Sequence, residues 1–251
     1  MLIDSHVHIG KSEKSERFFS FDSYLKIMKE YSVDRAIVMP NVSSDIRSYF
    51  LNFDFLSKYN ELTLSSKNKF FPFLLIDPKD ESIHKQIQDN LKQIRGVKYH
   101  PSVTTSVCTD KQVYSIFKSL PNNFIVLVHC GRHWRSHISY VLKAASDFKN
   151  LIFIAAHMGG NATDLIEEAL NLIHDSKLDN VYIDISTSKL PWLIERAIWK
   201  IGDNKILFGS DEPYGDTLVT KYCLSLAKIT KDSNEKILYK NILNILGENY
   251  G

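Results

Sequence analysis

The chain has 251 residues, of which 44% are hydrophobic and 24% are charged. This length suits one α/β barrel around a single core and leaves no room for a second full domain, so residues 1–251 are predicted to form a single domain. The formal charge is only +2, from 31 basic and 29 acidic residues, and the basic residues form no long run. We therefore expect a small-molecule substrate and no nucleic-acid partner.

The first residues and the cysteines indicate the compartment. The chain opens without a basic start, an apolar leader or an uncharged stretch of about 18 residues, so neither export nor membrane insertion is expected. Cys108, Cys130 and Cys223 are odd in number and far apart, which fits reduced thiols better than a disulfide framework. We predict a cytoplasmic protein with no membrane partner, and a homodimer stays open because symmetric pairing is the default for soluble oligomers.

Eight short apolar runs alternate with segments of helical character along the chain. The predicted strands cover residues 2–8, 34–40, 70–76, 95–100, 124–129, 151–157, 180–186 and 205–211. Their ends are 24 to 36 residues apart, which is the length of a strand plus a crossover helix. Several runs are apolar almost throughout, as is typical of parallel strands covered on both faces.

The pattern predicts a single (β/α)₈ TIM barrel of the α/β class. Helices are expected at residues 80–93, 135–148, 162–175, 191–201 and 234–246. An open doubly wound sheet is the alternative, but the glycine cluster that follows the first strand of a nucleotide-binding sheet is missing.

Titratable side chains lie at or near the ends of six predicted strands. In a parallel barrel the active site forms where the strands end, so these side chains are predicted to share one site. They are His6 and His8, Lys98 and His100, His129, His157, Asp184, and Asp211.

His6 and His8 are two residues apart on a strand, so their side chains are predicted to lie on one face. An isolated pair of this kind is more often two structural histidines held by hydrogen bonds. His129 and Asp211 change that interpretation, because polar groups at the ends of apolar strands gain little from burial without a partner. Together these four residues offer three nitrogens and one oxygen, which suits Zn²⁺ or a similar ion. We predict one divalent metal ion per chain, with Zn²⁺ as the expected ion and a second ion left open.

Five segments resemble successive motifs of the amidohydrolase superfamily. They are Ile-Asp-Ser-His-Val-His at residues 3–8, Gly-Val-Lys-Tyr-His-Pro at 96–101, Val-His-Cys-Gly at 128–131, Ala-His-Met-Gly-Gly at 156–160 and Leu-Phe-Gly-Ser-Asp at 207–211. The closest branch is the amidohydrolase-related group that includes aminocarboxymuconate-semialdehyde decarboxylase and resorcylate decarboxylases. The resemblance implies that His6, His8 and His129 ligate the metal beside Asp211. It also implies that His157 acts on the substrate or binds a second ion.

Two reactions fit these residues. In a hydrolase, a metal-activated water attacks an amide, lactone or ester-like bond, with Asp211 taking the proton and His157 polarising the carbonyl. In a non-oxidative decarboxylase of an aromatic or unsaturated acid, the same residues orient the substrate and manage protons. A barrel without chemistry, serving as a scaffold, would show a broken ligand set, whereas all five motifs are intact. We take hydrolase as the leading prediction and decarboxylase as the alternative.

Three further residues are candidates for substrate binding. Lys98 shares a face with His100 and is expected to be an ammonium paired with Asp184; the alternative is the carboxylated lysine that some superfamily members carry on this strand. His100 is expected either to contact substrate or to support the site. Arg132, in the loop after His129, could clamp an anionic group, with a solvated helix start as the alternative.

Two further polar residues lie next to these motifs. Asp4 is expected to support the first strand, and Glu212 either contacts substrate or is solvated. Substrate specificity is expected to depend on the loops at residues 10–21, 41–53, 101–108 and 213–217. The sequence alone does not predict the conformation of these loops.

Overall fold

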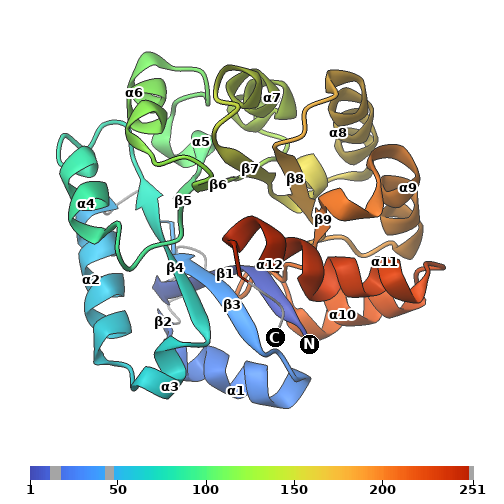
Figure 1. Cartoon of the computed structure of the whole chain (residues 1–251), viewed down its shortest axis with the longest axis horizontal. Helices are drawn as coiled ribbons and strands as arrows, with labels where there is room; N and C mark the ends of the chain where they lie inside the picture. Colours follow the sequence, from blue (N-terminus) through green and yellow to red (C-terminus); the bar gives the residue numbers. More distant parts are fainter. Residues whose placement is uncertain (12–17, 43–47, 249–251) are drawn as a thin grey trace.

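The computed structural model describes residues 1–11, 18–42 and 48–248. In these residues, eight parallel strands follow one another around a curved sheet with helices outside it, which confirms the predicted TIM barrel (Figure 1). The parallel strands are β1 (Ile3–Lys11), β3 (Arg35–Pro40), β4 (Phe70–Ile76), β5 (Gly96–Tyr99), β6 (Ile125–Val128), β7 (Ile152–Ala155), β8 (Val181–Asp184) and β9 (Ile206–Leu207). A short strand that the sequence pattern did not predict, β2 (Phe18–Phe19), pairs antiparallel with the end of β1.

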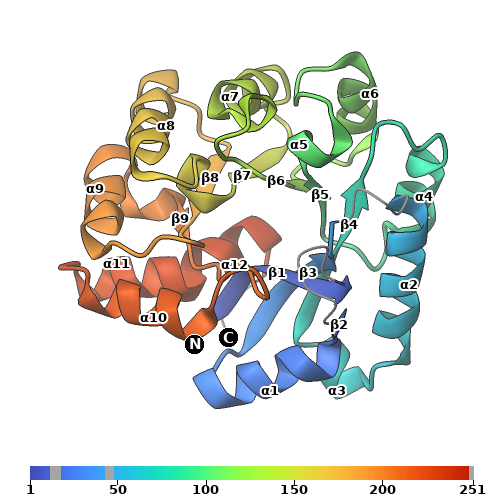
Figure 2. The same ribbon diagram turned by 180° about the vertical axis from the view of Figure 1, so that it is seen from behind.

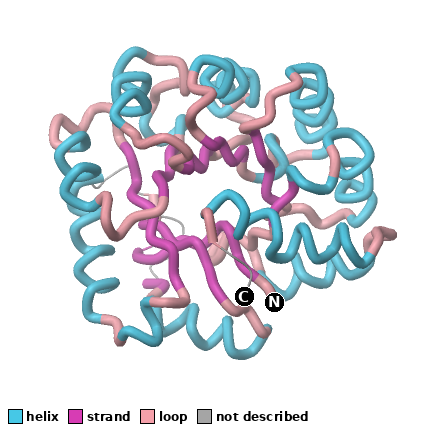
Figure 3. The backbone as a smooth tube through the Cα atoms, viewed as in Figure 1, coloured by secondary structure: helices cyan, strands magenta, loops and turns pink. Residues whose placement is uncertain are grey.

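The barrel is closed by the segment that follows β9. The backbone N–H of Ser5 donates to the carbonyl of Phe208 at 2.9 Å, and that of Asp211 donates to the carbonyl of His6 at 2.8 Å. The backbone carbonyl of Glu212 then accepts a hydrogen bond from the N–H of His8 at 2.7 Å. These bonds hold the last strand segment against the first, so residues about 200 positions apart become neighbours. Figure 3 shows the strands curving around the centre of the molecule with the helices outside them.

The helices surround the strands. They are α1 (Phe21–Tyr31), α2 (Ser48–Glu61), α3 (Leu64–Lys67), α4 (Ile83–Asn90), α5 (Pro101–Thr104), α6 (Lys111–Ser119), α7 (Ile138–Asp147), α8 (Thr163–Ser176), α9 (Pro191–Ile201), α10 (Thr217–Leu226), α11 (Lys231–Glu235) and α12 (Asn241–Leu246). Short helical turns are η1 (Trp134–Ser136), η2 (His157–Gly159), η3 (Asp203–Lys205) and the wider turn η4 (Lys236–Lys240). The helix expected at residues 191–201 has those bounds, with Pro191 in its first turn, where proline needs no N–H partner. The segment expected at 234–246 is divided among α11, η4 and α12.

Two hydrophobic cores hold the barrel. The larger core lies between the strands and the outer helices. The smaller core contains Ile3, Phe71 and Ile125, which lie at or near the starts of their strands, together with Ile242 and Leu243 of α12. Helix α12 therefore covers the end of the barrel where the strands begin, and the ends of the strands remain available for a site (Figures 1 and 2). Among the described residues, no helix has both the length and the apolar character of a membrane span.

Candidate active site

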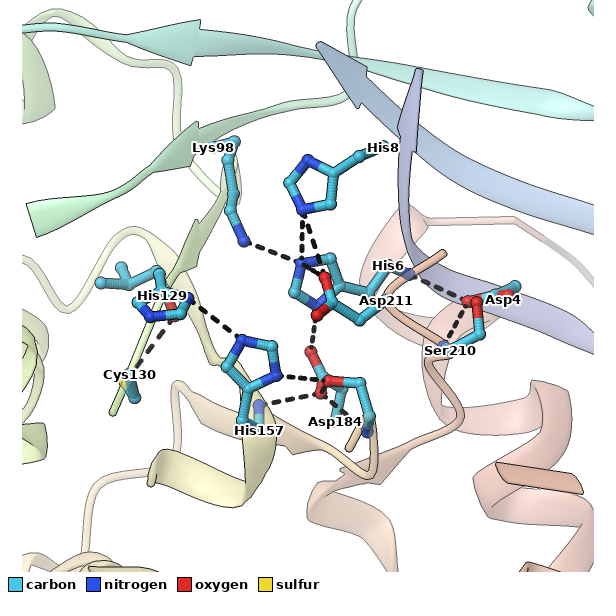
Figure 4. Close-up of polar contacts among 12 residues, drawn as sticks. Asp4, His6, His8, Lys98, His129, Cys130, His157, Asp184, Ser210 and Asp211 are labelled. Carbon is cyan, nitrogen blue, oxygen red and sulfur yellow. Dashed lines mark hydrogen bonds and ion pairs between the residues drawn. The ribbon is translucent and has the colours of Figure 1, made fainter. Parts of the chain in front are cut away.

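Three hydrogen-bond acceptors converge where β1 meets the segment after β9. His6 Nε2 lies 3.2 Å from His8 Nε2, and Asp211 Oδ1 lies 3.3 Å from each of these nitrogens (Figure 4). Ligands at about 2.1 Å from a tetrahedral zinc ion are about 3.4 Å apart. The triangle therefore has the dimensions of a metal-ligand set, and three acceptors this close need a positive charge among them.

The hydrogen bonds of the two histidines fix which ring nitrogen carries the proton. His6 Nδ1 lies 3.0 Å from Asp184 Oδ2, and His8 Nδ1 lies 3.2 Å from the carbonyl oxygen of Pro40. An ionised carboxylate and a carbonyl only accept hydrogen bonds, so both Nδ1 atoms donate. Each neutral ring then presents a lone pair at Nε2, which is the form of histidine that binds a metal.

Asp184 is ionised despite complete burial. Burial by itself would raise its pKa, but the charge and hydrogen bond of His6 outweigh that effect and hold the pKa well below its usual range. The same balance applies to Asp211, where burial is outweighed by His6 and His157 and the pKa is also well below its usual range.

Asp211 is held by an unusual backbone conformation. Its φ of 63° lies in the left-handed region, which costs energy for a residue with a Cβ atom. The carbonyl of Asp211 accepts hydrogen bonds from the N–H groups of Tyr214 and Gly215, both at 2.7 Å. Together with the bond from its own N–H to His6, these contacts aim its carboxylate at the two histidines.

Asp4 supports the first strand, as expected from the sequence. Its carboxylate accepts from the backbone N–H groups of Ser210 at 2.9 Å and His6 at 3.1 Å, and from the hydroxyl of Tyr24 at 2.8 Å. Burial raises the pKa of Asp4 to about 7, although these hydrogen bonds act in the opposite direction. Asp4 therefore ties β1 to the strand segment that carries Asp211.

Lys98 brings a buried amine to the same place. Its Nζ lies 2.8 Å from His6 Nε2, and its side chain is fully buried. Burial lowers its pKa to about 8, while the charges of Asp211 and Asp184 act to raise it. The hydrogen-bond partner of Lys98 is thus His6, whereas its interaction with Asp184 is electrostatic.

His129 lies beside this triangle rather than in it. Its ring stacks on His100, with ring centres 3.9 Å apart and planes 11° apart, and its Nδ1 lies 3.1 Å from His157 Nε2. Among the described residues, two groups around His6 have ligand atoms that all lie within 4.8 Å of one another, and neither contains His129: His6, His8 and Asp211, and His6, His157 and Asp184. The role of His129 as a further ligand stays a prediction.

A cavity of about 440 Å³ opens in front of these groups, a size that suits a small molecule. It is lined by His8, Val42, His100, Ser102, Val103, His129, His157, Asn161, Thr187, Asp211 and Tyr214. Tyr214 belongs to the expected substrate loop at residues 213–217, whereas sequence reasoning did not find Asn161 and Thr187, because they belong to irregular segments without a periodic pattern. The parts of the expected substrate loops at residues 12–17 and 43–47 lie outside the described residues.

Two candidates from the sequence lie away from this cavity. The side chain of Arg132 is 71% exposed, and its guanidinium lies 4.0 Å from Asp164. Glu212 is buried and accepts hydrogen bonds from the N–H and the hydroxyl of Thr217, at 2.9 and 3.1 Å. Glu212 therefore holds the start of α10 and is not solvated, which was one of the two roles expected for it.

Comparisons with known proteins agree with this architecture. A family model described as Amidohydrolase matches residues 3–247, whereas no curated protein matches the sequence. A putative amidohydrolase from Staphylococcus aureus is 14% identical with a TM-score of 0.77, over 98% of this chain and 99% of its own.

Two further structures have stated activities. A dihydroxybenzoic acid decarboxylase from Polaromonas sp. JS666, solved with manganese and 2-nitroresorcinol, is 15% identical with a TM-score of 0.76, over 100% of this chain and 98% of its own. A probable 2-pyrone-4,6-dicarboxylic acid hydrolase from Acinetobacter baumannii is 13% identical with a TM-score of 0.71, over 98% and 99%. At these identities the likeness shows the shared barrel.

Proposed function

The chain belongs to the amidohydrolase family, and on that premise we propose that it is a metal-dependent hydrolase of an amide, lactone or ester-like bond in a small molecule. The observation that carries the proposal is the triangle of His6 Nε2, His8 Nε2 and Asp211 Oδ1 at the open end of the barrel. The hydrogen bonds behind the histidines prepare two of these three atoms as lone-pair donors.

A divalent ion bound here would lower the pKa of a water molecule and polarise a substrate carbonyl. We expect Zn²⁺, since nitrogen and carboxylate ligands suit it. The Polaromonas decarboxylase contains manganese, so the identity of the ion must be measured. His6 and His8 would hold the ion, with Asp211 at its edge and His129 as the predicted further ligand.

The cavity wall supplies groups for substrate and proton handling. The carboxylate of Asp211 lines the cavity, where it can accept a proton from an attacking water. His157 lines the same wall and is the second predicted catalytic residue. Ser102, Asn161 and Thr187 offer hydroxyl and amide groups that could orient a polar substrate.

Decarboxylation of an aromatic or unsaturated acid is the second candidate. It is favoured by the Polaromonas enzyme and by a 2,6-dihydroxybenzoate decarboxylase, which share this barrel. The same triangle would orient the acid, and Asp211 and His157 would manage the proton that replaces the carboxylate. The two reactions therefore use one site and differ in their product.

Product analysis separates the two candidates. Protein purified without chelator would be assayed for metal content, for acid release from a panel of lactones, esters and amides, and for CO₂ release from aromatic carboxylates. We expect about one ion per chain and metal-dependent acid release. Release of CO₂ with no hydrolysis would select the decarboxylase instead.

The metal site itself is tested with the double variant His6→Ala/His8→Ala. It should lose the ion, whereas His174→Ala, at an exposed histidine of α8, should retain it. Unchanged metal content in the double variant would remove the basis of the proposal.

A further inference from the structure

A chain of hydrogen bonds leads from the cavity wall to the buried carboxylate of Asp184. His129 Nδ1 lies 3.1 Å from His157 Nε2, and His157 Nδ1 lies 2.8 Å from the hydroxyl of Ser186. The hydroxyl of Ser186 in turn contacts Asp184 Oδ1. Asp184 is the residue that also accepts from His6, through its other oxygen.

The direction of every hydrogen bond in this chain follows from its last member. The ionised carboxylate of Asp184 can only accept, so Ser186 gives its one hydroxyl hydrogen to Oδ1. The Ser186 oxygen is then an acceptor, and His157 Nδ1 must donate to it. A neutral imidazole carries one N–H, so His157 Nε2 is a lone pair and His129 Nδ1 is the donor that meets it. His129 is left with a lone pair at Nε2.

Asp184 also fixes the backbone that carries His157. Its Oδ1 accepts from the N–H groups of His157 at 3.0 Å and Ser186 at 3.1 Å. His157 has a φ of 59°, in the left-handed region, and this N–H bond holds it there. One carboxylate therefore orients both the β1 histidine and the histidine that follows β7.

We propose that Ser186 is a positioning residue that sets the tautomers of His157 and, through it, of His129. The proposal deepens the proposed function and rests on it, because the Nε2 lone pair of His129 is what a metal ligand requires. In this state His157 Nε2 accepts a hydrogen bond and has none to give. Toward a substrate, a His157 ring in this state has no Nε2 proton with which to polarise a carbonyl.

The variant Ser186→Ala removes the acceptor of His157 Nδ1 and leaves the His6–Asp184 bond in place. Ser188→Ala is the matched control, because Ser188 is also buried, two residues further on, and its hydroxyl has no hydrogen-bond partner in the described residues. Ser186→Thr restores the hydroxyl.

The primary readout is the ¹⁵N spectrum of the histidine rings, with His157 assigned by the signal lost in His157→Gln. It is recorded on the protein as purified and again after chelation, so it does not depend on activity. In wild type we expect a proton on Nδ1 and none on Nε2 of His157. In Ser186→Ala we expect a mixture of two His157 tautomers, with the proton on Nε2 in some molecules and on Nδ1 in the others. Ser188→Ala should keep the wild-type pattern, and Ser186→Thr should regain it.

The second readout is zinc affinity, which we expect to fall about 10-fold in Ser186→Ala and not in Ser188→Ala, because partners of ligand histidines typically contribute 10–100-fold. A wild-type His157 ring protonated at Nε2, or an unchanged spectrum in Ser186→Ala, would overturn the proposal. Altered tautomers with unchanged zinc affinity would also overturn it, because His129 would then not be positioned for the ion. If wild type binds no metal, the proposed function fails and this link to the ion fails with it, while the spectra still decide the tautomers.

Discussion

Replacement of Asp184 by asparagine should weaken metal binding without touching a predicted ligand. The Oδ1 side of Asp184 receives three donors, from the N–H of His157 and from the N–H and hydroxyl of Ser186, whereas the Oδ2 side receives one, from His6 Nδ1. An asparagine has only one side-chain oxygen. With that oxygen on the Oδ1 side, three hydrogen bonds are kept, whereas on the Oδ2 side only one is kept. The first orientation is therefore preferred by about 2 kcal/mol.

The amide nitrogen of the introduced asparagine would then face His6 Nδ1, so two donors would oppose each other. His6 relieves this by moving its proton to Nε2, which removes the lone pair that the ion needs. We expect a 10- to 100-fold loss of zinc affinity, or about 1.4 to 2.7 kcal/mol. We also expect the metal-free protein to lose about 1 kcal/mol of stability, since a buried hydrogen bond to a charged group is replaced by a weaker neutral one.

Competition titration with a zinc chelator measures the affinity, and urea unfolding of the metal-free protein measures the stability. The control is Asp175→Asn, because Asp175 accepts from His174 Nδ1 at 2.9 Å in an exposed pair on α8. It should change neither quantity. Wild-type zinc affinity in the Asp184→Asn variant would refute the assignment of the His6 proton.

Three further predictions concern Lys98, His6 and Arg132. Lys98→Met removes the amine that shares His6 Nε2, so chelator competition should show zinc binding about 10-fold tighter; a loss of zinc would instead show that Lys98 contributes to the ligand set. In metal-free protein, burial lowers the pKa of His6 to about 4, from 6.5 in the unfolded chain. The unfolded chain therefore takes up this proton first, and stability that is complete above pH 6.5 is lost as the pH falls toward 4. Urea titrations should show that the free energy of unfolding of wild type falls by about 3 kcal/mol more than that of His6→Asn across this pH window. An equal pH dependence in the two proteins would contradict the lowered pKa of His6. Arg132→Ala should change KM less than about twofold for anionic and neutral substrates alike, because its side chain lies outside the cavity lining; a rise of about tenfold for anionic substrates alone would restore its predicted role.

The sequence predicted the barrel because parallel strands leave a pattern that does not depend on their neighbours. Several strands are apolar on both faces, and each crossover has a characteristic length. The ends of the strands could also be predicted, since a histidine or aspartate at the end of an apolar run gains little from burial unless it has a partner. That is why His6, His8, His157 and Asp211 could be named before their distances were known.

Other features of the site follow from contacts between strands and loops. Asp184 was expected to pair with Lys98, and its interaction with Lys98 is electrostatic, whereas its hydrogen-bond partners include His6 and the backbone N–H of His157. Glu212 was expected to be solvated or to face substrate, yet the turn after Asp211 folds it back onto Thr217.

By itself, the sequence determined the fold, the end of the barrel that carries the site and the residue types gathered there, because strand periodicity and strand ends are local properties. Only the tertiary structure decided which acceptors form the triangle, which nitrogen of each histidine is protonated, and that His129 lies beside His157. Those features depend on lateral distances between strands and on loop conformation, and no spacing along the chain encodes either one.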